Sequence, residues 1–394
     1  MINRPGYKHT PLGWIPEEWE IYPVGKAFKI CNNLRYPISE EVRRTIPGQY
    51  PYYGPTKVQD FINEYRVEGK YALIGEDGDH FLKWKELPMT LLVDGKFNVN
   101  NHAHLIQGNE ISVTEWFFYF FNHKELTTYL TRQGAGRYKL TKDALSKMPI
   151  PLPSVQEQSK ITTILAVWDN AITKTQQIIA QLQHRNKGLM RQLLTSEKRI
   201  KGFSEPWKEL HLAEAFNERN ETGYVNLNLL SVGSLGVYPQ SQSEKRDTSN
   251  SDKAKYKRIC PGDIGYNTMR MWQGRSALSS LEGIVSPAYT IVTPKDGQHS
   301  QFYAYLFKLP SVVNKFFRNS QGLVEDTLNC KFKDFSIVKV EVPEYEEQVA
   351  IANVLTTAQT EIKSYEQKLN ALQQQKKGLM QKLLTGEVRV KIEK

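Results

Sequence analysis

Side chains that can hydrogen-bond to the edges of DNA bases gather in one stretch of the first third of the chain. The stretch contains Lys96, Asn98, Asn100, Asn101, His102 and His104. Amide side chains pair with adenine in the major groove, and each such pair is worth about 1 to 3 kcal/mol of discrimination. We therefore predict a DNA contact here. In the alternative, the asparagines satisfy backbone groups of a strand–turn–strand. A zinc site at the His-x-His pair is disfavoured because no cysteine lies nearby.

Two more segments of this part of the chain have residues suited to phosphate groups. The first consists of Arg132, Arg137, Tyr138 and Lys139, which bracket the small residues 134–136. The second contains Arg43 and Lys57, with further arginine and tyrosine side chains between them. Such side chains position a protein on the DNA backbone without reading its sequence. For Arg43 and Lys57, an ordinary solvated surface is the alternative.

The second part of the chain has a strongly basic segment at 241–258. Its basic residues are Lys245, Arg246, Lys253, Lys255, Lys257 and Arg258, against three acidic residues. Lys and Arg side chains that neutralise phosphates supply most of the sequence-independent affinity for DNA. The composition therefore favours a mobile loop that closes on the DNA backbone.

A second candidate for base recognition follows directly. It combines Asn267, Arg270, Trp272, Gln273 and Arg275. Arginine pairs with guanine and glutamine with adenine, so the two arginines and the glutamine are the side chains that we expect at base edges. In the alternative, Trp272 belongs to the core and the two arginines pair with Glu282 or Asp263.

No sequence pattern predicts catalysis. The chain lacks the Asn/Asp-Pro-Pro-Tyr/Phe run typical of adenine methylation, a phosphate-binding loop and the His-Glu-x-x-His zinc motif. An acidic turn at 76–79 has residues that can hold a cation, but turns of this kind usually just link strands. We expect no catalytic residue, no metal site and no cofactor in this chain.

Composition indicates a folded protein of two domains with a polyanionic partner. The 394 residues are too many for one ordinary core. Lys and Arg outnumber Asp and Glu by 52 to 42, a net charge of +10, which fits DNA or simply a basic surface that aids solubility. Cys31, Cys260 and Cys330 are odd in number and too far apart for a disulfide framework or a zinc site. A polar N-terminus and the absence of a long apolar run predict a cytoplasmic protein.

An internal repeat organises the chain and must position these candidate sites. Residues 153–201 align with 343–391 at a constant offset of 190, with 19 identities in 49 pairs. In both copies apolar residues recur three and four positions apart, as in a helix that packs along a seam. Each seam includes one polar residue at the same place, Asn186 and Lys376. A glycine follows two positions later, where it costs about 1 kcal/mol relative to alanine, and either a close backbone neighbour or a local kink would explain it.

The order of segments requires the two helices to be antiparallel. The first helix, of about 40 residues and so about 60 Å, leaves one globular segment and enters the other, where the second helix starts. Packing along matching seams then sends the second helix back. We predict globular domains at 1–152 and 202–342, spacer helices at 153–201 and, with the tail, 343–394, and a pseudo-twofold axis. Two unlike domains on such a spacer suit an interrupted DNA site with unequal halves.

The sequence resembles the specificity subunits of type I restriction-modification systems along essentially its whole length. The likeness rests on Leu12-Gly13-Trp14-Ile15-Pro16, on Ile150-Pro151-Leu152-Pro153 followed by Glu157-Gln158, on Val342-Pro343 followed by Glu347-Gln348, on the Lys-Gly-Leu-Met-x-x-Leu-Leu-Thr helix ends, and on Val285-Ser286-Pro287-Ala288-Tyr289. The resemblance implies two target-recognition domains of mixed α/β fold, joined by the two long antiparallel, coiled-coil-like helices predicted above. It implies a non-catalytic subunit that serves host defence.

The resemblance also implies partners. These are methylation subunits that bind S-adenosylmethionine and modify adenine, and restriction/translocase subunits that use ATP and magnesium. Because the helix ends are the best-preserved part of the repeat, we predict that one contact is made twice, with two methylation subunits. The candidate residues are Lys187, Met190, Leu194, Lys377, Met380 and Leu384. Alternatively, these residues preserve helix packing. Competing functions are a free-standing DNA-binding regulator or scaffold, and a self-sufficient nuclease.

Overall fold

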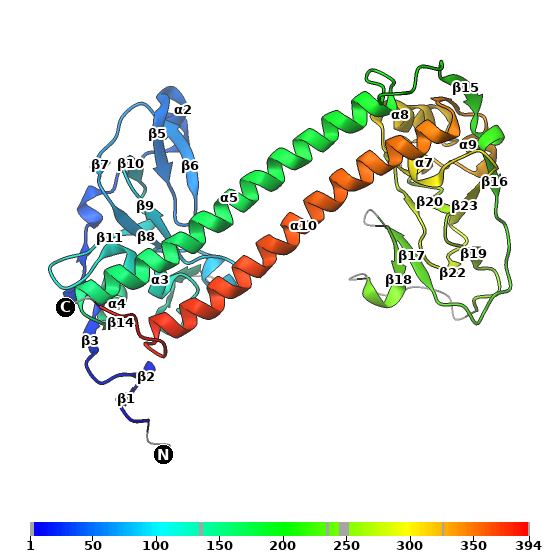
Figure 1. Cartoon of the computed structure of the whole chain (residues 1–394). Coiled ribbons are helices and arrows are strands. Elements are labelled where there is room, and N and C mark those ends of the chain that lie inside the picture. Colours follow the sequence, from blue (N-terminus) through cyan, green and yellow to red (C-terminus); the bar gives the residue numbers. More distant parts are fainter. Residues whose placement is uncertain (1–3, 134–136, 234–235, 244–251, 325–326, 393–394) are drawn as a thin grey trace. The chain divides into compact units, whose positions relative to one another are not determined.

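The computed structural model describes residues 4–133, 137–233, 236–243, 252–324 and 327–392 (Figure 1). The chain divides into two compact units: residues 1–175 with 368–394 form the first, and residues 176–367 form the second. Each unit therefore contains one globular region and a segment of both long helices. Among the described helices, none is both long and apolar enough to cross a lipid bilayer.

The globular region of the first unit is built from short strands and helices. Its strands are β1 (Tyr7–Thr10), β2 (Gly13–Pro16), β3 (Glu20–Pro23), β4 (Lys29–Ile30), β5 (Pro47–Tyr53), β6 (Val58–Ile62), β7 (Val67–Glu68), β8 (Tyr71–Gly75), β9 (Thr90–Val93), β10 (Lys96–Val99), β11 (Ala103–Gln107), β12 (Thr131–Gln133), β13 (Arg137–Lys139) and β14 (Pro149–Leu152). Its helices are α1 (Val24–Ala27), α2 (Glu40–Thr45), α3 (Thr114–Phe121) and α4 (Lys142–Lys147), with single turns η1 (Asn32–Leu34), η2 (Asp79–Lys83) and η3 (Thr127–Tyr129).

The globular region of the second unit has a similar make-up. Its strands are β15 (Lys208–His211), β16 (Phe216–Glu218), β17 (Leu230–Gly233), β18 (Gly236–Pro239), β19 (Lys257–Ile259), β20 (Ile264–Asn267), β21 (Ser276–Leu278), β22 (Gly283–Val285), β23 (Tyr289–Pro294) and β24 (Lys339–Val342). Its helices are α6 (Leu212–Ala215), α7 (Ser300–Leu306), α8 (Pro310–Asn319) and α9 (Phe332–Ser336), with single turns η4 (Gln240–Gln242) and η5 (Met271–Gln273).

The main sheets of the two units share one strand order. It runs β4-β11-β8-β9 in the first unit and β16-β23-β20-β21 in the second, and all neighbours are antiparallel. The loop between β8 and β9 therefore corresponds to the loop between β20 and β21. The first unit adds the sheet β6-β5-β10-β7, and the second adds the pairs β17-β18 and β19-β22. The framework is thus shared, and the additions to it differ.

Each globular region begins and ends on two strands that pair with each other. β3 pairs antiparallel with β14, and β15 pairs in the same way with β24. The long helices follow directly: α5 (Val155–Leu194) comes after β14, and α10 (Tyr345–Leu384) comes after β24. The start of each helix is therefore fixed next to the entry strand of its own domain.

The ends of the long helices belong to the cores of the units. In the first unit Leu383 and Leu384 share one apolar cluster with the buried Trp19 and Trp116. In the second unit Leu193 and Leu194 lie in a cluster rich in aromatic residues. Aromatic side chains bury 150–250 Å² each and dominate such cores. Each core is consequently closed by the helix that starts from the other globular region.

The two long helices are antiparallel where they pack, as the sequence predicts. Both have 40 residues and no internal proline. In the first unit Glu157 contacts Arg389, and Asp169 of α5 contacts Lys376. Residue numbers therefore rise along α5 as they fall along the segment that packs against it. The second unit shows the same reversal, because Asn186 contacts Gln359 and Arg199 contacts Glu347.

The polar layer of the seam differs between the units. In the first, Lys376 pairs with Asp169 at 2.5 Å, and Asp169 also accepts a hydrogen bond from the Tyr119 hydroxyl at 2.8 Å. In the second, the equivalent positions are neutral, and Asn186 donates to Gln359 at 3.3 Å. Each layer places a polar contact within an apolar seam, which fixes the register of a helix pair, although the Asn186 Oδ1 atom itself is buried without a hydrogen-bond partner among the described residues.

The seam glycines do not mark a close backbone contact. A Cβ built on Gly188 or Gly378 meets no atom within 4 Å, so the expectation of a close neighbour at these positions was wrong. The helices continue through both residues. Left-handed residues follow the helix ends instead, with φ of +56° at Ser196 and +71° at Gly386, as in ordinary helix C-caps.

A buried carboxylate at the start of each long helix is held by an arginine beyond the end of the other. Arg389 donates to both oxygens of Glu157 at 2.8 and 3.0 Å, and Arg199 to both oxygens of Glu347 at 2.7 and 2.6 Å. The two glutamates are only 2% and 1% exposed. Paired hydrogen bonds between arginine and carboxylate are among the strongest polar contacts in proteins. The repeat thus makes one demanding contact twice.

The glutamine beside each glutamate ties the helix to its own globular region. Gln158 accepts from the backbone N–H of Val113 at 3.0 Å, and Gln348 from that of His299 at 2.9 Å. Val113 and His299 are the N-cap residues of α3 and α7. Each glutamine also donates to the carbonyl of the proline five residues before it, at 2.9 Å. The Glu-Gln pairs seen in the sequence are therefore structural connectors.

Replacing Arg199 with alanine should lower the free energy of unfolding by about 3 kcal/mol, because Glu347 would stay buried without a counter-charge. Denaturant unfolding of the whole chain measures this loss. The matched control is Arg185→Ala, since Arg185 is 54% exposed and pairs with Glu361 at the surface of the same helix pair. Its loss should stay below about 1 kcal/mol. Equal losses for the two variants would contradict the role given to the buried pair.

Candidate nucleic-acid interface

A hollow of about 670 Å³ opens in the second unit beside the β20–β21 loop. Its walls include Ser231, Tyr238, Asn267, Arg270, Gln273 and Arg275. The first two come from the β17–β18 hairpin, and the last three from the loop after β20. The hollow thus gathers four of the five residues that the sequence singled out at 267–275, together with hydroxyl groups from a separate hairpin.

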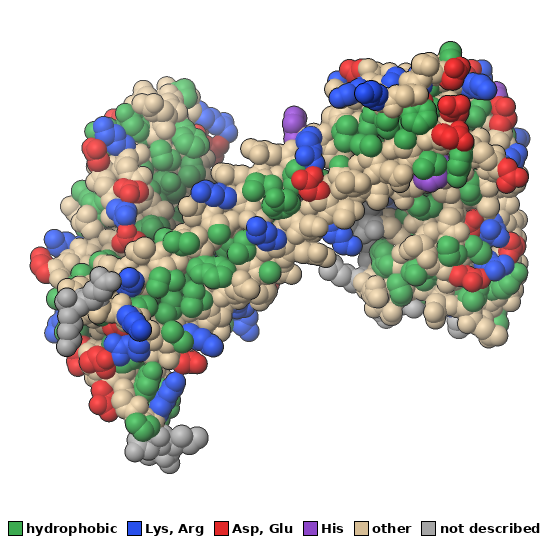
Figure 2. All heavy atoms as spheres, in the orientation of Figure 1, with side chains coloured by type: hydrophobic (Ala, Val, Ile, Leu, Met, Phe, Trp, Pro, Cys, Tyr) green, Lys and Arg blue, Asp and Glu red, His purple; other side chains and the backbone are tan. Residues whose placement is uncertain are grey.

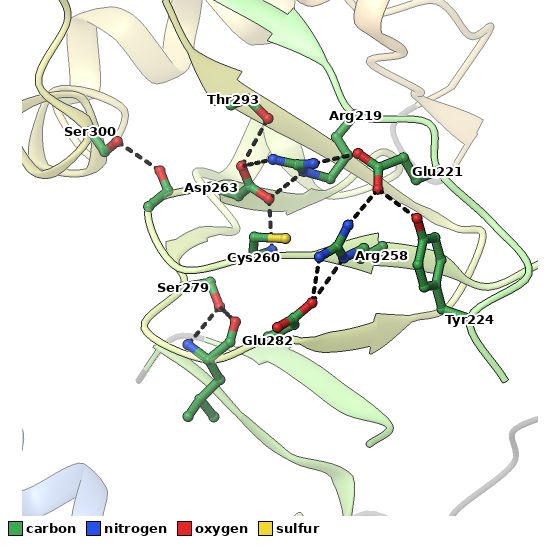
Figure 3. Close-up of polar contacts among 12 residues, drawn as sticks. Arg219, Glu221, Tyr224, Arg258, Cys260, Asp263, Ser279, Glu282, Thr293 and Ser300 are labelled. Carbon is green, nitrogen blue, oxygen red and sulfur yellow. Dashed lines mark hydrogen bonds and ion pairs between the residues drawn. The ribbon is translucent and has the colours of Figure 1, made fainter. Parts of the chain in front are cut away.

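The carboxylates of this unit are engaged by other arginines (Figure 3). Arg219 donates to Asp263 at 2.7 and 3.3 Å, and Arg258 donates to Glu282 at 2.6 and 3.0 Å. Both arginines also bond to Glu221, whose pKa is lowered by the hydrogen bond from Arg258. The predicted alternative, in which the loop arginines pair with Glu282 or Asp263, is therefore wrong.

Arg270 and Arg275 consequently keep free guanidinium groups. Both are exposed, and neither has an ion-pair partner among the residues that the structure describes. Trp272 is half-buried instead: its Nε1 donates to the Met269 carbonyl at 3.0 Å and its ring packs on Phe317. The tryptophan holds the loop, and the arginines remain available to an anionic ligand.

The basic segment 241–258 supplies fewer free charges than the sequence suggested. Lys245 and Arg246 lie outside the described residues. Lys257 pairs with Glu218 at 3.5 Å, and Arg258 belongs to the network of Figure 3. Lys255 is exposed. Arg258 and Lys257 thus form ion pairs within the unit, and their contact with phosphates stays a prediction.

In the first unit, three of the predicted base-reading side chains are buried. Asn98 accepts from the Arg66 N–H at 3.0 Å, and Asn100 accepts from the His102 N–H at 2.9 Å. His104 is fully buried, and its Nε2 donates to the Leu140 carbonyl at 2.8 Å. Burial lowers the pKa of His104 below its ordinary value. These side chains satisfy backbone groups, so their assignment to base edges is corrected.

The other predicted residues of this stretch lie at the surface. His102 Nδ1 contacts both carboxylate oxygens of Asp77, at 2.9 and 3.0 Å. Lys96 lies over the ring of Tyr65, 4.6 Å from its centroid, and Asn101 is exposed. Among the described residues, no group of three His, Cys, Asp or Glu side chains has the arrangement of a metal site.

In the two segments of the first unit that we predicted to contact phosphates, only some of the side chains remain available at the surface. Arg43 bonds to Asp60 at 3.3 Å and to the Ile38 carbonyl at 2.9 Å, whereas Lys57 is exposed. Arg132 donates to the Tyr138 hydroxyl at 2.9 Å, and Lys139 pairs with Glu76 at 3.2 Å. The side chain of Arg137 and residues 134–136 lie outside the described residues. Lys57 and Arg132 remain the best surface candidates of these segments.

An aromatic and cationic surface near β6 was missed by the sequence reasoning. Arg66 lies over the ring of Tyr36, 3.5 Å from its centroid, and the rings of Tyr50 and Tyr65 are in contact. Phe61 of β6 is 51% exposed. The buried Asn98 supports this surface, because its amide donates to the Glu64 carbonyl at 2.7 Å. The available signal was the two aromatic residues and the arginine within 61–66.

Comparisons with known proteins agree with this architecture. Residues 16–184 match the family model of the type I restriction modification DNA specificity domain. The MjaVIII type I restriction enzyme specificity subunit of Methanocaldococcus jannaschii is 25% identical over 96% of this chain and 94% of its own length. Over nearly its whole length the chain is similar to type I restriction enzyme specificity subunits.

Two further comparisons give similar matches. A type I restriction enzyme specificity subunit of Haemophilus influenzae is 34% identical over 38% of this chain and 36% of its own length. The crystal structure of the type I restriction-modification S subunit from M. genitalium superposes with a TM-score of 0.63 at 12% identity, over 95% of this chain and 97% of that one. The structural likeness shows that the two-domain, two-helix fold is shared.

The helix residues predicted to bind a partner occupy different environments in the structure. Lys187 and Lys377 are exposed, and the two methionines, Met190 and Met380, are half-buried. Leu194 and Leu384 are only 2% and 8% exposed, because they lie in the cores of the units. A side chain inside the core of its own chain offers no surface to a partner. The leucines are therefore packing residues, as the alternative had it.

Stability measurements should separate the structural arginines from the free ones. Arg219→Ala leaves the buried Asp263 unpaired and should lower the free energy of unfolding by about 3 kcal/mol. Arg275→Ala removes an exposed, unpaired side chain and should change it by less than about 0.5 kcal/mol. Denaturant unfolding checks both values. A large loss for Arg275→Ala would mean that this arginine has a structural partner after all.

Proposed function

We propose that this specificity subunit selects the DNA target of a type I restriction-modification complex, and that each unit reads one half of an asymmetric, interrupted sequence. The subunit itself supplies no catalytic group. The observation that carries the proposal is the pair of exposed arginines that line the hollow from the β20–β21 loop and have no ion-pair partner among the described residues, while Asp263 and Glu282 of the same unit are bound by other arginines.

The free arginines provide the chemistry that base recognition needs. An arginine pairs with the O6 and N7 atoms of guanine in the major groove. Gln273 in the same loop is exposed and offers the pattern that recognises adenine. Arg219 and Arg258 neutralise the carboxylates of Asp263 and Glu282. The loop arginines therefore keep their positive charge, which also attracts DNA phosphates.

The two units support unequal half-sites because one framework carries different loops. The β20–β21 loop presents two arginines and a glutamine. The corresponding β8–β9 loop begins with Glu76 and Asp77, which are bound to Lys139 and His102. Loops of opposite charge cannot read the same bases. The first half-site is instead served by the exposed Lys57, Lys96, Asn101 and Arg132 and by the surface around Arg66.

Affinity depends on these loops rather than on one basic surface. On the face shown in Figure 2, Lys and Arg side chains stand singly or in small groups among acidic and apolar ones. A net charge of +10 still favours association with DNA and makes it sensitive to salt. Phosphate contacts from scattered cations hold the protein on DNA, and the loops select the sequence.

The proposal includes the partners that the family implies. Two methylation subunits carry S-adenosylmethionine and modify adenine, and restriction/translocase subunits carry ATP and magnesium, all in the cytoplasm. On this chain, Lys187 and Lys377 are the exposed repeat-related residues that can contact both methylation subunits in the same way. The domain limits 1–152 and 202–342 define the parts that recognise DNA. Co-expression followed by mass measurement of the complex tests the assembly.

Replacing residues 208–340 with the equivalent segment of another specificity subunit should change one half of the methylated sequence and leave the other half intact. The exchange keeps the long helices and both Arg–Glu pairs, so the framework is preserved. Methylation mapping of a genome in cells that express the exchanged subunit with its partners measures both halves. A change in both halves would refute the assignment of one half to each unit.

Replacing Arg270 with alanine should reduce discrimination at one base pair of one half-site by about 1 to 3 kcal/mol, the worth of a paired contact to guanine. Binding to duplexes that differ at single positions measures the effect. The control is Arg318→Ala on α8, an exposed arginine that does not line the hollow. An equal loss of affinity for every sequence would assign Arg270 to a phosphate instead.

A further inference from the structure

Lys308 lies directly beneath the β20–β21 loop, although no sequence pattern pointed to it. It follows α7, and its Nζ donates to the Gly274 carbonyl at 2.6 Å and to the Ser276 carbonyl. These are the two carbonyls on either side of Arg275. Among the described residues, Lys308 has no carboxylate partner. Its ammonium group thus binds the backbone of the β20–β21 loop.

The rest of the loop is held just as firmly. Gly274 adopts the left-handed φ of +72°, and a Cβ there would meet Val313 of α8 at 3.1 Å. Trp272 packs on Phe317 of the same helix, and Met271 is buried. The loop therefore packs on α7 and α8. Among these contacts, the hydrogen bonds from Lys308 are the polar ones, and they lie next to Arg275.

We propose that Lys308 is a positioning residue, which directs Arg275 toward DNA and thereby sets sequence discrimination at the half-site of the second unit. This inference rests on the proposed function and deepens it. Lys308 lies under the loop and does not line the hollow, so it acts through Arg275 rather than on a base.

Lysine fits this task for a physical reason. Two backbone carbonyls need donors, and an ammonium group supplies three from a compact head. Any carboxylate that neutralised Lys308 would lie next to Arg275 and compete with DNA for that arginine. A lysine bound only to carbonyls orders the loop and leaves its positive charge intact.

The hydrogen bonds that Lys308 makes to the loop also depend on pH. Burial and the neighbouring Arg275 guanidinium lower the pKa of Lys308 to about 8. Above that pH the amine is increasingly neutral, and neutral donors form hydrogen bonds about half as strong as charged ones. Discrimination at the second unit's half-site is therefore full near pH 7 and declines toward pH 9.

The test uses the full chain in complex with its methylation partner, and duplexes altered in one half-site at a time. Lys308→Met should reduce discrimination at one half-site about tenfold, the effect of misplacing one paired arginine contact, and leave the other half-site unchanged. Lys308→Arg keeps a charged donor across the pH range and should retain discrimination at both pH 7 and pH 9. The matched control is Lys295→Met, because Lys295 also donates to a backbone carbonyl, that of Ala213 at 2.7 Å, away from the hollow.

The unaltered half-site serves as an internal measure of folding. If Lys308→Met discriminates as well as the original protein at both half-sites, or loses discrimination equally at both, the positioning role is refuted. If Lys308→Met fails to assemble, the pH profile of the unmodified chain against that of Lys308→Arg decides, and identical profiles refute the proposal. If the unmodified complex selects no interrupted sequence at all, the proposed function itself has failed.

Discussion

The arrangement of the long helices depends on two buried glutamates, each bound by an arginine. Glu157 and Glu347 are buried, and each is held by an arginine that the chain supplies from beyond the end of the opposite helix. A buried carboxylate without its counter-charge is strongly destabilising. The contact therefore forces each long helix to end where the other begins, and the antiparallel pairing, the cores at the helix ends and the repeated Glu-Gln connectors all follow from it.

This constraint explains why recognition can diverge while the framework does not. The shared parts are the strand order of the main sheet, the paired entry and exit strands and the Arg–Glu contacts. None of these parts includes the loop between the third and fourth strands of the sheet. The loops can therefore differ between the units. The loop of the second unit is cationic, whereas the loop of the first unit is acidic and its Asp77 is bound to His102. Stability and sequence selection are carried by different residues of the same chain.

The sequence predicted the framework well because a repeat of 49 aligned positions carries its own periodicity, and periodicity is a local property. The sequence predicted the candidate sites less well, because the exposure of a side chain depends on the tertiary fold and not only on its neighbours in sequence. Asn98, Asn100 and His104 have the right chemistry for bases, yet their strands turn them into the protein, where they satisfy backbone groups. Arg258 and Arg270 are indistinguishable in sequence, and only the position of Glu282 decides which of them is neutralised. Lys308 carried no local signal at all.

The discontinuity of the first unit has a consequence for how the protein is made. Residues 1–175 are synthesised early, but their core includes Leu383 and Leu384, and their buried Glu157 waits for Arg389. The second unit, by contrast, is one continuous stretch of chain. The portion that leaves the ribosome first is thus the last to be completed. Loss of the segment that contains Leu383, Leu384 and Arg389 would remove part of the core of the first unit.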